Sequence, residues 1–225
     1  MIPMLDDRLQ RLLWEATQET FVMVGWATLI AVAVGLPLGV LLVTMRPGGV
    51  LAFPAGHWVL DAVVNVGRSL PFIILMVAII PFTRALVGTS IGTTAAIVPL
   101  AVASIPFFAR VAETALLEVD HGLVEMIQAS GGTAWDVVRK ALIPEAVPSL
   151  IRGVTITLIN LIGYSAMAGV IGGGGLGDLA YRYGYQRFNG DVMIWTIIVL
   201  IVLVQAVQWL GNGIATVMQR RVKSS

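Results

Sequence analysis

The sequence has no cysteine, only two histidines and few charges. Of its 225 residues, 12% are charged and 57% are hydrophobic, and the mean hydropathy is +0.89. Without cysteine, disulfides and thiolate chemistry are excluded, and two histidines argue against a zinc site. A net charge of +1 does not provide the clustered basic face that nucleic-acid binding needs. A composition this apolar exceeds what a soluble core requires and predicts an integral membrane protein.

Long apolar stretches predict a helical membrane fold. A spanning helix needs roughly 20 apolar residues, whereas the strands of a barrel alternate polar with apolar positions. The stretches here do not alternate, so we expect an all-α integral membrane protein. We place five transmembrane helices at roughly residues 21–45, 58–82, 93–115, 150–172 and 193–217. The long, mixed-charge segment before the first helix is unlike a secretory leader, so we expect that helix to stay in the membrane.

Lysine and arginine residues near the span ends predict the orientation. With a cytoplasmic C-terminus, eight of the 14 lie on the inner side, five lie on the outer side, and Arg68 lies near or within a span. An odd number of spans then places the N-terminus outside. On this topology the chain has an extracytoplasmic segment (1–19), a transmembrane domain (17–209) and a cytoplasmic C-terminal tail (218–225).

The stretch VEMIQASGGTAWDVVRKALIPEAVPS, residues 124–149, gathers charges, glycines and prolines around an inner loop at residues 120–146. Thr133 and Asp136 have the spacing of a capping box, and Asp136 forms an i,i+4 pair with Lys140. Adjacent glycines supply a turn. We therefore expect two short helices that are joined at Gly131 and Gly132.

The apolar residues of this loop are expected to form an exposed face. The second helix should end at Pro144 and present a stripe of Trp135, Val138 and Leu142. The first helix carries a similar set: Leu123, Met126 and Ile127. Periodicity is equally compatible with a loop on the membrane surface and with one that docks on a partner. Two basic residues on the second helix are too few for the phosphate contacts of a DNA-binding helix-turn-helix.

The same loop resembles the EAA loop of ABC importer permeases. That motif reads Glu-Ala-Ala, three residues, Gly, nine residues and Ile-x-Leu-Pro, and Glu125, Gly131 and Pro144 match its spacing in full. Hydrophobic residues replace the expected ones at four positions: Met126, Ile127, Ala141 and Ile143. Longer segments, among them GRSLPFIILMVAIIPFTRALVG and GGGGLGDLAYRYGYQRF, are similar to the permeases of methionine importers, which have five spans per subunit.

This resemblance implies a type I ABC importer transmembrane domain and a role for the loop. In that family the loop is the coupling helix, which seats in a groove of a separate ATP-binding subunit. The expected coupling residues are Glu125, Ala129, Gly131, Gly132, Trp135, Val138, Leu142 and Pro144. The family also implies a homodimer of permeases, two ATP-binding cassette ATPase subunits and an extracytoplasmic substrate-binding lipoprotein, surrounded by the lipid of a bacterial inner membrane.

The sequence lacks the phosphate loop of an ATPase. That loop needs Gly-Lys followed by Ser or Thr, but Lys140 follows Arg139 and Lys223 follows Val222. We therefore expect this chain to be no enzyme and to bind no cofactor of its own. ATP and magnesium would be bound by the partner ATPase.

Polar residues within the fourth span are candidate contacts of a translocation pathway. They are Thr157, Asn160, Tyr164, Ser165 and Met167. The aromatic ring and the thioether suit a methionine side chain, and the hydroxyl and amide groups suit the ends of a zwitterion. Bonds across a helix or dimer interface explain the same residues equally well.

Two other patterns are interpreted as structural. Asp61, Asn65 and Arg68 share one face of the second span, and we expect a polar network in which Asp61 and Arg68 pair through an intermediate group. The run GGGGLG, residues 172–177, has the glycine spacing of a dinucleotide-binding fingerprint, but that fingerprint belongs between a strand and a helix. Here it follows a span on the outer side, which favours a flexible or tight turn.

These observations predict the permease subunit of an ATP-driven ABC importer that works by alternating access. Methionine is the expected substrate, and other amino acids or a quaternary amine such as glycine betaine are the alternatives. A secondary transporter or channel without an ATPase is the alternative from another class. A membrane scaffold without transport activity is a third.

Overall fold

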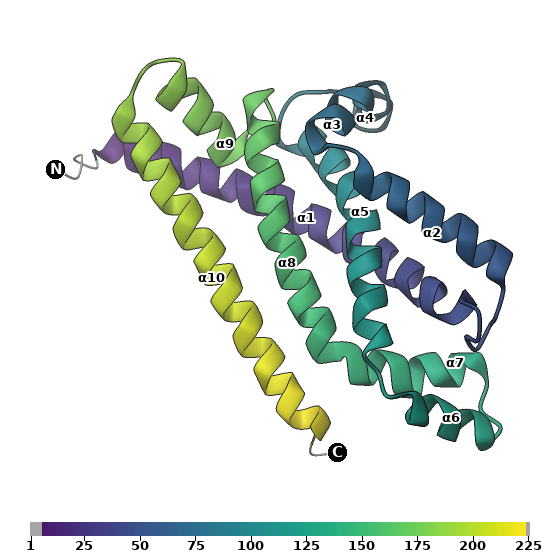
Figure 1. The fold of residues 1–225 in the computed structure, drawn as a ribbon. Helices are drawn as coiled ribbons and strands as arrows, with labels where there is room; N and C mark the ends of the chain where they lie inside the picture. Colours follow the sequence, from purple (N-terminus) through teal and green to yellow (C-terminus); the bar gives the residue numbers. More distant parts are fainter. Residues whose placement is uncertain (1–5, 224–225) are drawn as a thin grey trace. The chain divides into compact units, whose positions relative to one another are not determined.

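The computed structural model describes residues 6–223, with side chains up to Arg220. In chain order the helices are α1 (Asp7–Met45), α2 (Pro54–Ser69), α3 (Phe72–Ala78), α4 (Ile80–Val87), α5 (Thr93–Leu117), α6 (His121–Ala129), α7 (Ala134–Val137), the π-helix η1 (Val138–Leu142), α8 (Ile143–Val170), α9 (Gly175–Leu179), the π-helix η2 (Ala180–Tyr185) and α10 (Gly190–Lys223) (Figure 1). No strand occurs within residues 6–223, in agreement with the predicted all-α class. Residues 1–5 of the predicted N-terminal segment and 224–225 of the predicted tail lie outside the described residues.

Four helical stretches of the described chain are long and apolar enough to cross a membrane. They are Asp7–Met45, Thr93–Leu117, Ala134–Val170 and Gly190–Arg220. A fifth span results if α2 and α3, which form a bent pair, are counted as one. The number of spans therefore agrees with the prediction, and the second span, expected at roughly residues 58–82, consists of two helices that meet at a sharp bend.

The break in this second span lies at Leu70 and Pro71. Proline has no N–H to donate to the preceding turn, so a helix cannot pass through it without losing a hydrogen bond. The carbonyl of Pro71 instead accepts from the amides of Ile74 and Leu75, each at 3.0 Å, and these bonds begin α3. The proline thus ends one helix and begins another.

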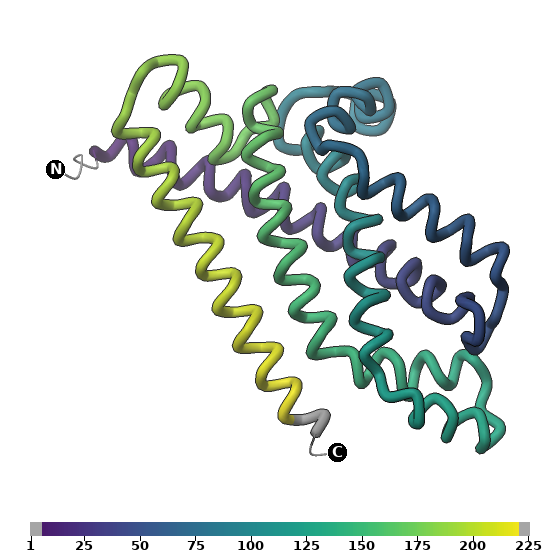
Figure 2. Tube along the Cα trace, in the orientation of Figure 1, coloured from purple at the N-terminus to yellow at the C-terminus, as the bar shows by residue number. Residues whose placement is uncertain are grey.

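The chain forms two compact units, and Figure 2 traces their segments. The first unit comprises residues 1–29, 70–104 and 158–208. The second comprises residues 30–69, 105–157 and 209–225, and we call it the hairpin unit because it contains α6, α7 and η1. The long helices α1, α5, α8 and α10 contribute residues to both units.

In the hairpin unit, α1 and α5 approach each other at two glycines of α1. A Cβ on Gly35 would lie 3.0 Å from the carbonyl oxygen of Ile105, and a Cβ on Gly39 would lie 2.8 Å from that of Ala109. Only small residues allow helix backbones to come this close. The buried ring of Phe108 and its apolar neighbours form the core beside this contact.

In the first unit, α1 holds the glycine turn. The amide of Gly175 donates to a carboxylate oxygen of Glu19 at 2.6 Å, and that of Leu176 donates to the hydroxyl of Thr20 at 3.0 Å. Gly174 and Gly175 have φ values of 81° and 76°, which favour glycine. The tight turn expected for residues 172–177 is therefore confirmed.

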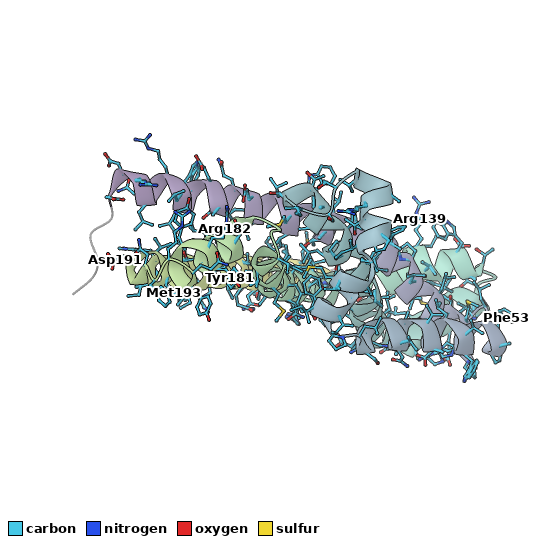
Figure 3. All side chains as sticks on the ribbon, turned by 90° about the horizontal axis from the view of Figure 1, so that it is seen from above. Phe53, Arg139, Tyr181, Arg182, Asp191 and Met193 are labelled. Atoms are coloured by element: carbon cyan, nitrogen blue, oxygen red, sulfur yellow. The ribbon has the colours of Figure 1, made fainter. Side chains whose placement is uncertain are left out.

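Charged and aromatic side chains after this turn pair within the first unit. Arg182 and Tyr181 lie on η2 (Figure 3). Arg182 donates to Asp178, and this hydrogen bond is the main reason why the pKa of Arg182 is raised. The guanidinium of Arg187 lies 4.4 Å from the centre of the Tyr183 ring, a cation–π contact.

Candidate functional site

The loop between α5 and α8 folds as a helical hairpin, as expected for residues 120–146. The carboxylate of Asp120 accepts from the amide of Gly122 at 2.7 Å and begins α6. After α6 the chain reverses at Gly131, which has a φ of 80°. The amide of Gly132 then donates to the carbonyl of Ile127 at 2.9 Å. The two glycines form the turn that the sequence predicts.

A capping box begins the second arm of the hairpin. The amide of Asp136 donates to the hydroxyl of Thr133 at 3.2 Å, and the amide of Thr133 donates back to the carboxylate of Asp136 at 3.0 Å. Lys140 lies one turn further on, with its Nζ 2.6 Å from the same carboxylate. Both short-range predictions for this arm are confirmed.

The predicted exposed stripe of Trp135, Val138 and Leu142 is wrong for two of its three residues. Trp135 is 68% exposed, but Val138 and Leu142 are each only 5% exposed. They pack into the core of the hairpin unit together with Val137, which is fully buried. The apolar face of this arm therefore anchors the hairpin to its own chain.

A π turn explains why the stripe does not continue. The amide of Ile143 donates to the carbonyl of Val138, five residues earlier, whereas an α-helix bonds residues four apart. The wider turn rotates Leu142 relative to Trp135, so the regular 3.6-residue pattern used for the prediction does not apply. Pro144 also does not end the helix, contrary to the prediction: α8 begins at Ile143, directly after η1, and continues through Pro144 to Val170.

The exposed side of the hairpin carries a different set of residues. Met126 is 58% exposed, and Glu125, Ala129 and Trp135 are exposed as well. The carboxylate of Glu125 lies 3.7 Å from Nε2 of His121. Helical spacing placed Met126 with Leu123 and Ile127, but those two are half-buried while Met126 points outward. Met126 directly follows Glu125, the glutamate of the EAA pattern, and this position was the signal that could have identified Met126 as part of the exposed side.

A polar network joins α2 to α5 in the hairpin unit. The guanidinium of Arg110 lies 2.6 Å from Asp61 and 2.6 Å from Glu113, and it donates to the side-chain oxygen of Asn65 at 2.9 Å. Asn65 in turn donates to Asp61 at 3.1 Å. The network on this face is confirmed, but the cation is Arg110, and the predicted pairing of Asp61 with Arg68 is wrong.

Two of the five candidate pathway residues on α8 form hydrogen bonds within their own helix. The hydroxyl of Thr157, in the hairpin unit, donates to the carbonyl of Gly153 at 2.9 Å. The hydroxyl of Ser165, in the first unit, donates to that of Ile162 at 2.8 Å. These two hydroxyls are buried and already satisfied.

The other three pathway residues lie in the first unit. Tyr164 stacks on Phe72, with ring centres 4.6 Å apart and planes within 5°. Asn160 is half-buried, and Met167 is 47% exposed. A flat stacked pair beside an exposed thioether offers apolar contact to a ligand. Substrate contact by this set stays a prediction.

Comparison with known proteins adds the context of a family. The family described as "Binding-protein-dependent transport system inner membrane component" matches residues 35–224. The probable D-methionine transport system permease protein MetI of Vibrio cholerae is 53% identical over 203 residues, which are 90% of each chain. The D-methionine transport system permease protein MetI of Escherichia coli K12 is 52% identical over 72% of each chain. The methionine import system permease protein MetP of Bacillus subtilis is 43% identical over 93% of this chain and 94% of its own.

Solved structures show the same architecture. A chain from the inward-facing MetNI methionine ABC transporter has a TM-score of 0.93 and 46% identity, and the match covers 95% of this chain and 99% of that one. A chain from an amino acid ABC transporter solved with histidines has a TM-score of 0.74. Its identity is 21%, so this second likeness concerns the fold alone.

Proposed function

Because the chain belongs to the family of binding-protein-dependent transport system inner membrane components, we propose that it is the permease subunit of a methionine ABC importer. The observation that carries the proposal is the likeness to the MetNI structure over nearly the whole of both chains. Relatives named for methionine or D-methionine transport support the substrate. Other amino acids and glycine betaine remain the alternative substrates.

The hairpin is the coupling element in this proposal. Its exposed side, with Met126 and Trp135, docks in a groove of a separate ATPase subunit, while its buried side holds it to α1 and α5. ATP and magnesium bind to that ATPase, because this chain lacks a phosphate loop. Closure of the ATPase dimer moves the hairpin, and packed side chains carry the movement into the spans.

The complete importer in this proposal contains two permeases, two ATPase subunits and an extracytoplasmic binding lipoprotein. It lies in a bacterial inner membrane with the N-terminus outside and the C-terminus inside, as the lysine and arginine distribution favours. Tyr164, Asn160 and Met167 supply weak contacts along the pathway. No charged residue stands among the five candidate pathway residues, which fits a transient passage with selection by the binding protein.

Transport in proteoliposomes tests the proposal. The chain is co-purified with its ATPase, reconstituted, and supplied with binding protein and radiolabelled methionine. We expect uptake only when ATP is present on the side of the membrane where the ATPase lies. Uptake driven by a proton or sodium gradient without ATP would establish the secondary transporter instead. Competition with unlabelled amino acids and glycine betaine then separates the possible substrates.

A further inference from the structure

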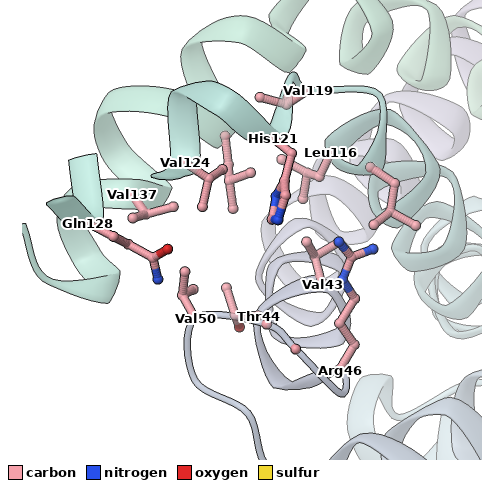
Figure 4. A pocket seen from close by; sticks show the side chains of 14 residues that line it. Val43, Thr44, Arg46, Val50, Leu116, Val119, His121, Val124, Gln128 and Val137 are labelled. Carbon is pink, nitrogen blue, oxygen red and sulfur yellow. The ribbon is translucent and has the colours of Figure 1, made fainter. Parts of the chain in front are cut away.

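A small pocket lies inside the hairpin unit, between the end of α1 and the hairpin (Figure 4). Its walls come from the end of α1, the loop after it, the end of α5, and α6 with the following arm. The cavity volume is about 50 Å³. One water-sized group needs about 10–15 Å³ of such space, so the pocket holds roughly four. That is room for a phosphate group but not for an amino acid.

Basic side chains face this pocket from two different elements. Arg46, just after α1, and His121, at the start of α6, point toward one another across it, and the amide of Gln128 points in from the same helix (Figure 4). Of the side chains that the structure describes, no aspartate or glutamate lines the pocket. Its polar rim is therefore suited to an anion, and its floor is apolar, with Val43 and Val124 among the lining residues.

The neighbouring charges leave Arg46 available. Glu125 lies 3.7 Å from Nε2 of His121 but does not line the pocket. Asp120 is engaged with the amide of Gly122, and Glu118 accepts from Ser149. Among the described residues, Arg46 has no ion pair. A guanidinium without an acidic partner at the edge of a pocket is a strong donor for an oxyanion.

The wall that carries Arg46 is already ordered. The amide of Gly49 donates to the carbonyl of Arg46 at 2.8 Å, that of Leu51 to Thr44 at 2.9 Å, and that of Phe53 to Met45 at 3.0 Å. These bonds fold the loop back onto the end of α1. A ligand therefore has little chain to order when it binds, which favours affinity.

We propose that this pocket binds a phosphate group, with Arg46 as its principal ligand and His121 and Gln128 as further donors. Two chemical sources share this group: the headgroup of an anionic phospholipid and free phosphate. The orientation in the proposed function puts the end of α1 at the cytoplasmic membrane face, where anionic lipids attract basic residues. A phosphate held by Arg46 and His121 links the end of α1 to α6 and so stiffens the hairpin.

Binding to the purified, full-length chain tests this site directly. Three probes are titrated separately: dihexanoyl phosphatidylglycerol, dihexanoyl phosphatidylcholine and inorganic phosphate. We expect Arg46→Gln to weaken binding of phosphatidylglycerol or of phosphate by about tenfold, the effect of losing one charge-assisted contact. His121→Gln should give a smaller loss. Arg139→Gln is the matched control, because Arg139 is an exposed hairpin arginine that does not line the pocket (Figure 3).

Each outcome has a definite meaning. Phosphatidylglycerol binding that depends on Arg46 identifies a lipid headgroup, and phosphate binding with the same dependence identifies the free anion. Equal affinity of the wild type and Arg46→Gln, or an equal loss in Arg139→Gln, overturns the proposal. If Arg46→Gln does not fold, as judged by thermal unfolding, His121→Gln and Gln128→Ala decide the question. Because binding is measured on the chain itself, its result is independent of whether methionine is transported.

Discussion

At the scale of single residues, the second arm of the hairpin carries two kinds of apolar side chain. Val137 is fully buried, whereas Trp135, two residues earlier, is 68% exposed. Val137 stabilises the hairpin by packing into the core of the hairpin unit, whereas Trp135 is free to contact another protein. Substitutions at these two positions should therefore have separable effects.

Trp135→Asp should leave the free energy of unfolding within about 0.5 kcal/mol of wild type, because the ring contributes little to the core. It should reduce co-purification of the ATPase. Val137→Asp should instead lower the melting temperature, since it buries a charge without a partner. Thermal unfolding and pull-down on both variants check this. A Trp135→Asp chain that retains normal ATPase binding contradicts the docking face.

Arg110 offers a second prediction for a single residue. Replacing it with glutamine leaves Asp61 and Glu113 without their cation, and the side chains of all three are only partly exposed to solvent. We expect a loss of about 1–3 kcal/mol in unfolding free energy, between the values for surface and buried pairs. Arg68→Gln is the control and should have little effect. Denaturant or thermal unfolding in detergent measures both, and equal losses would contradict the network.

At the scale of elements, the hairpin shows which features follow from short-range sequence rules. The capping box and the i,i+4 pair involve residues within four positions, so spacing alone predicted them correctly. The π turn did not follow from spacing, because its sequence has no signal that distinguishes it from an α-helix. The contact between Asp61 and Arg110 crosses 49 positions, and periodicity along one helix contains no information about such a pair.

The glycine turn gives a prediction at this scale. Gly131 has a positive φ, and a Cβ on Gly132 would lie 2.8 Å from the carbonyl oxygen of Ile127. Gly132→Ala should therefore destabilise the hairpin by about 1–3 kcal/mol, as for other overpacked sites. Gly213→Ala is the matched control, since among the described residues no atom outside the adjoining backbone of α10 lies within 4 Å of the added methyl. The rate of proteolytic cleavage within the hairpin is measured for both variants, and Gly132→Ala should be cleaved faster. Equal rates for the two variants would contradict the tight turn.

At the scale of the whole molecule, composition was sufficient to predict the membrane class, while the division of labour with an ATPase stays a proposal. Five apolar stretches predicted the spans, and a proline within the second span is compatible with a kink, but its complete break into α2 and α3 required the structure. The proposed function places ATP hydrolysis on another chain, and the lack of a phosphate loop in this sequence supports that proposal.

This division of labour predicts the behaviour of the isolated chain. Purified alone, it should release no phosphate from MgATP above the level of a detergent blank. Addition of the purified ATPase should restore hydrolysis, and the Trp135→Asp variant should restore less. A colorimetric phosphate assay measures all three. Hydrolysis by the permease alone, after removal of contaminating ATPases, would show that the motif argument is wrong.

The π turn of η1 has a further consequence for how this chain can change. It holds one residue more than an α-helical turn needs, so it is a place where the helix can lose a residue and remain a helix. Because the wider turn already absorbs the extra residue, removing it would return this stretch to a regular α-helix with little rotation of Trp135 relative to α8. A single deletion in η1 is therefore expected to keep the aim of the arm, whereas the same deletion within α8 would turn the arm by about 100°, at 3.6 residues per turn.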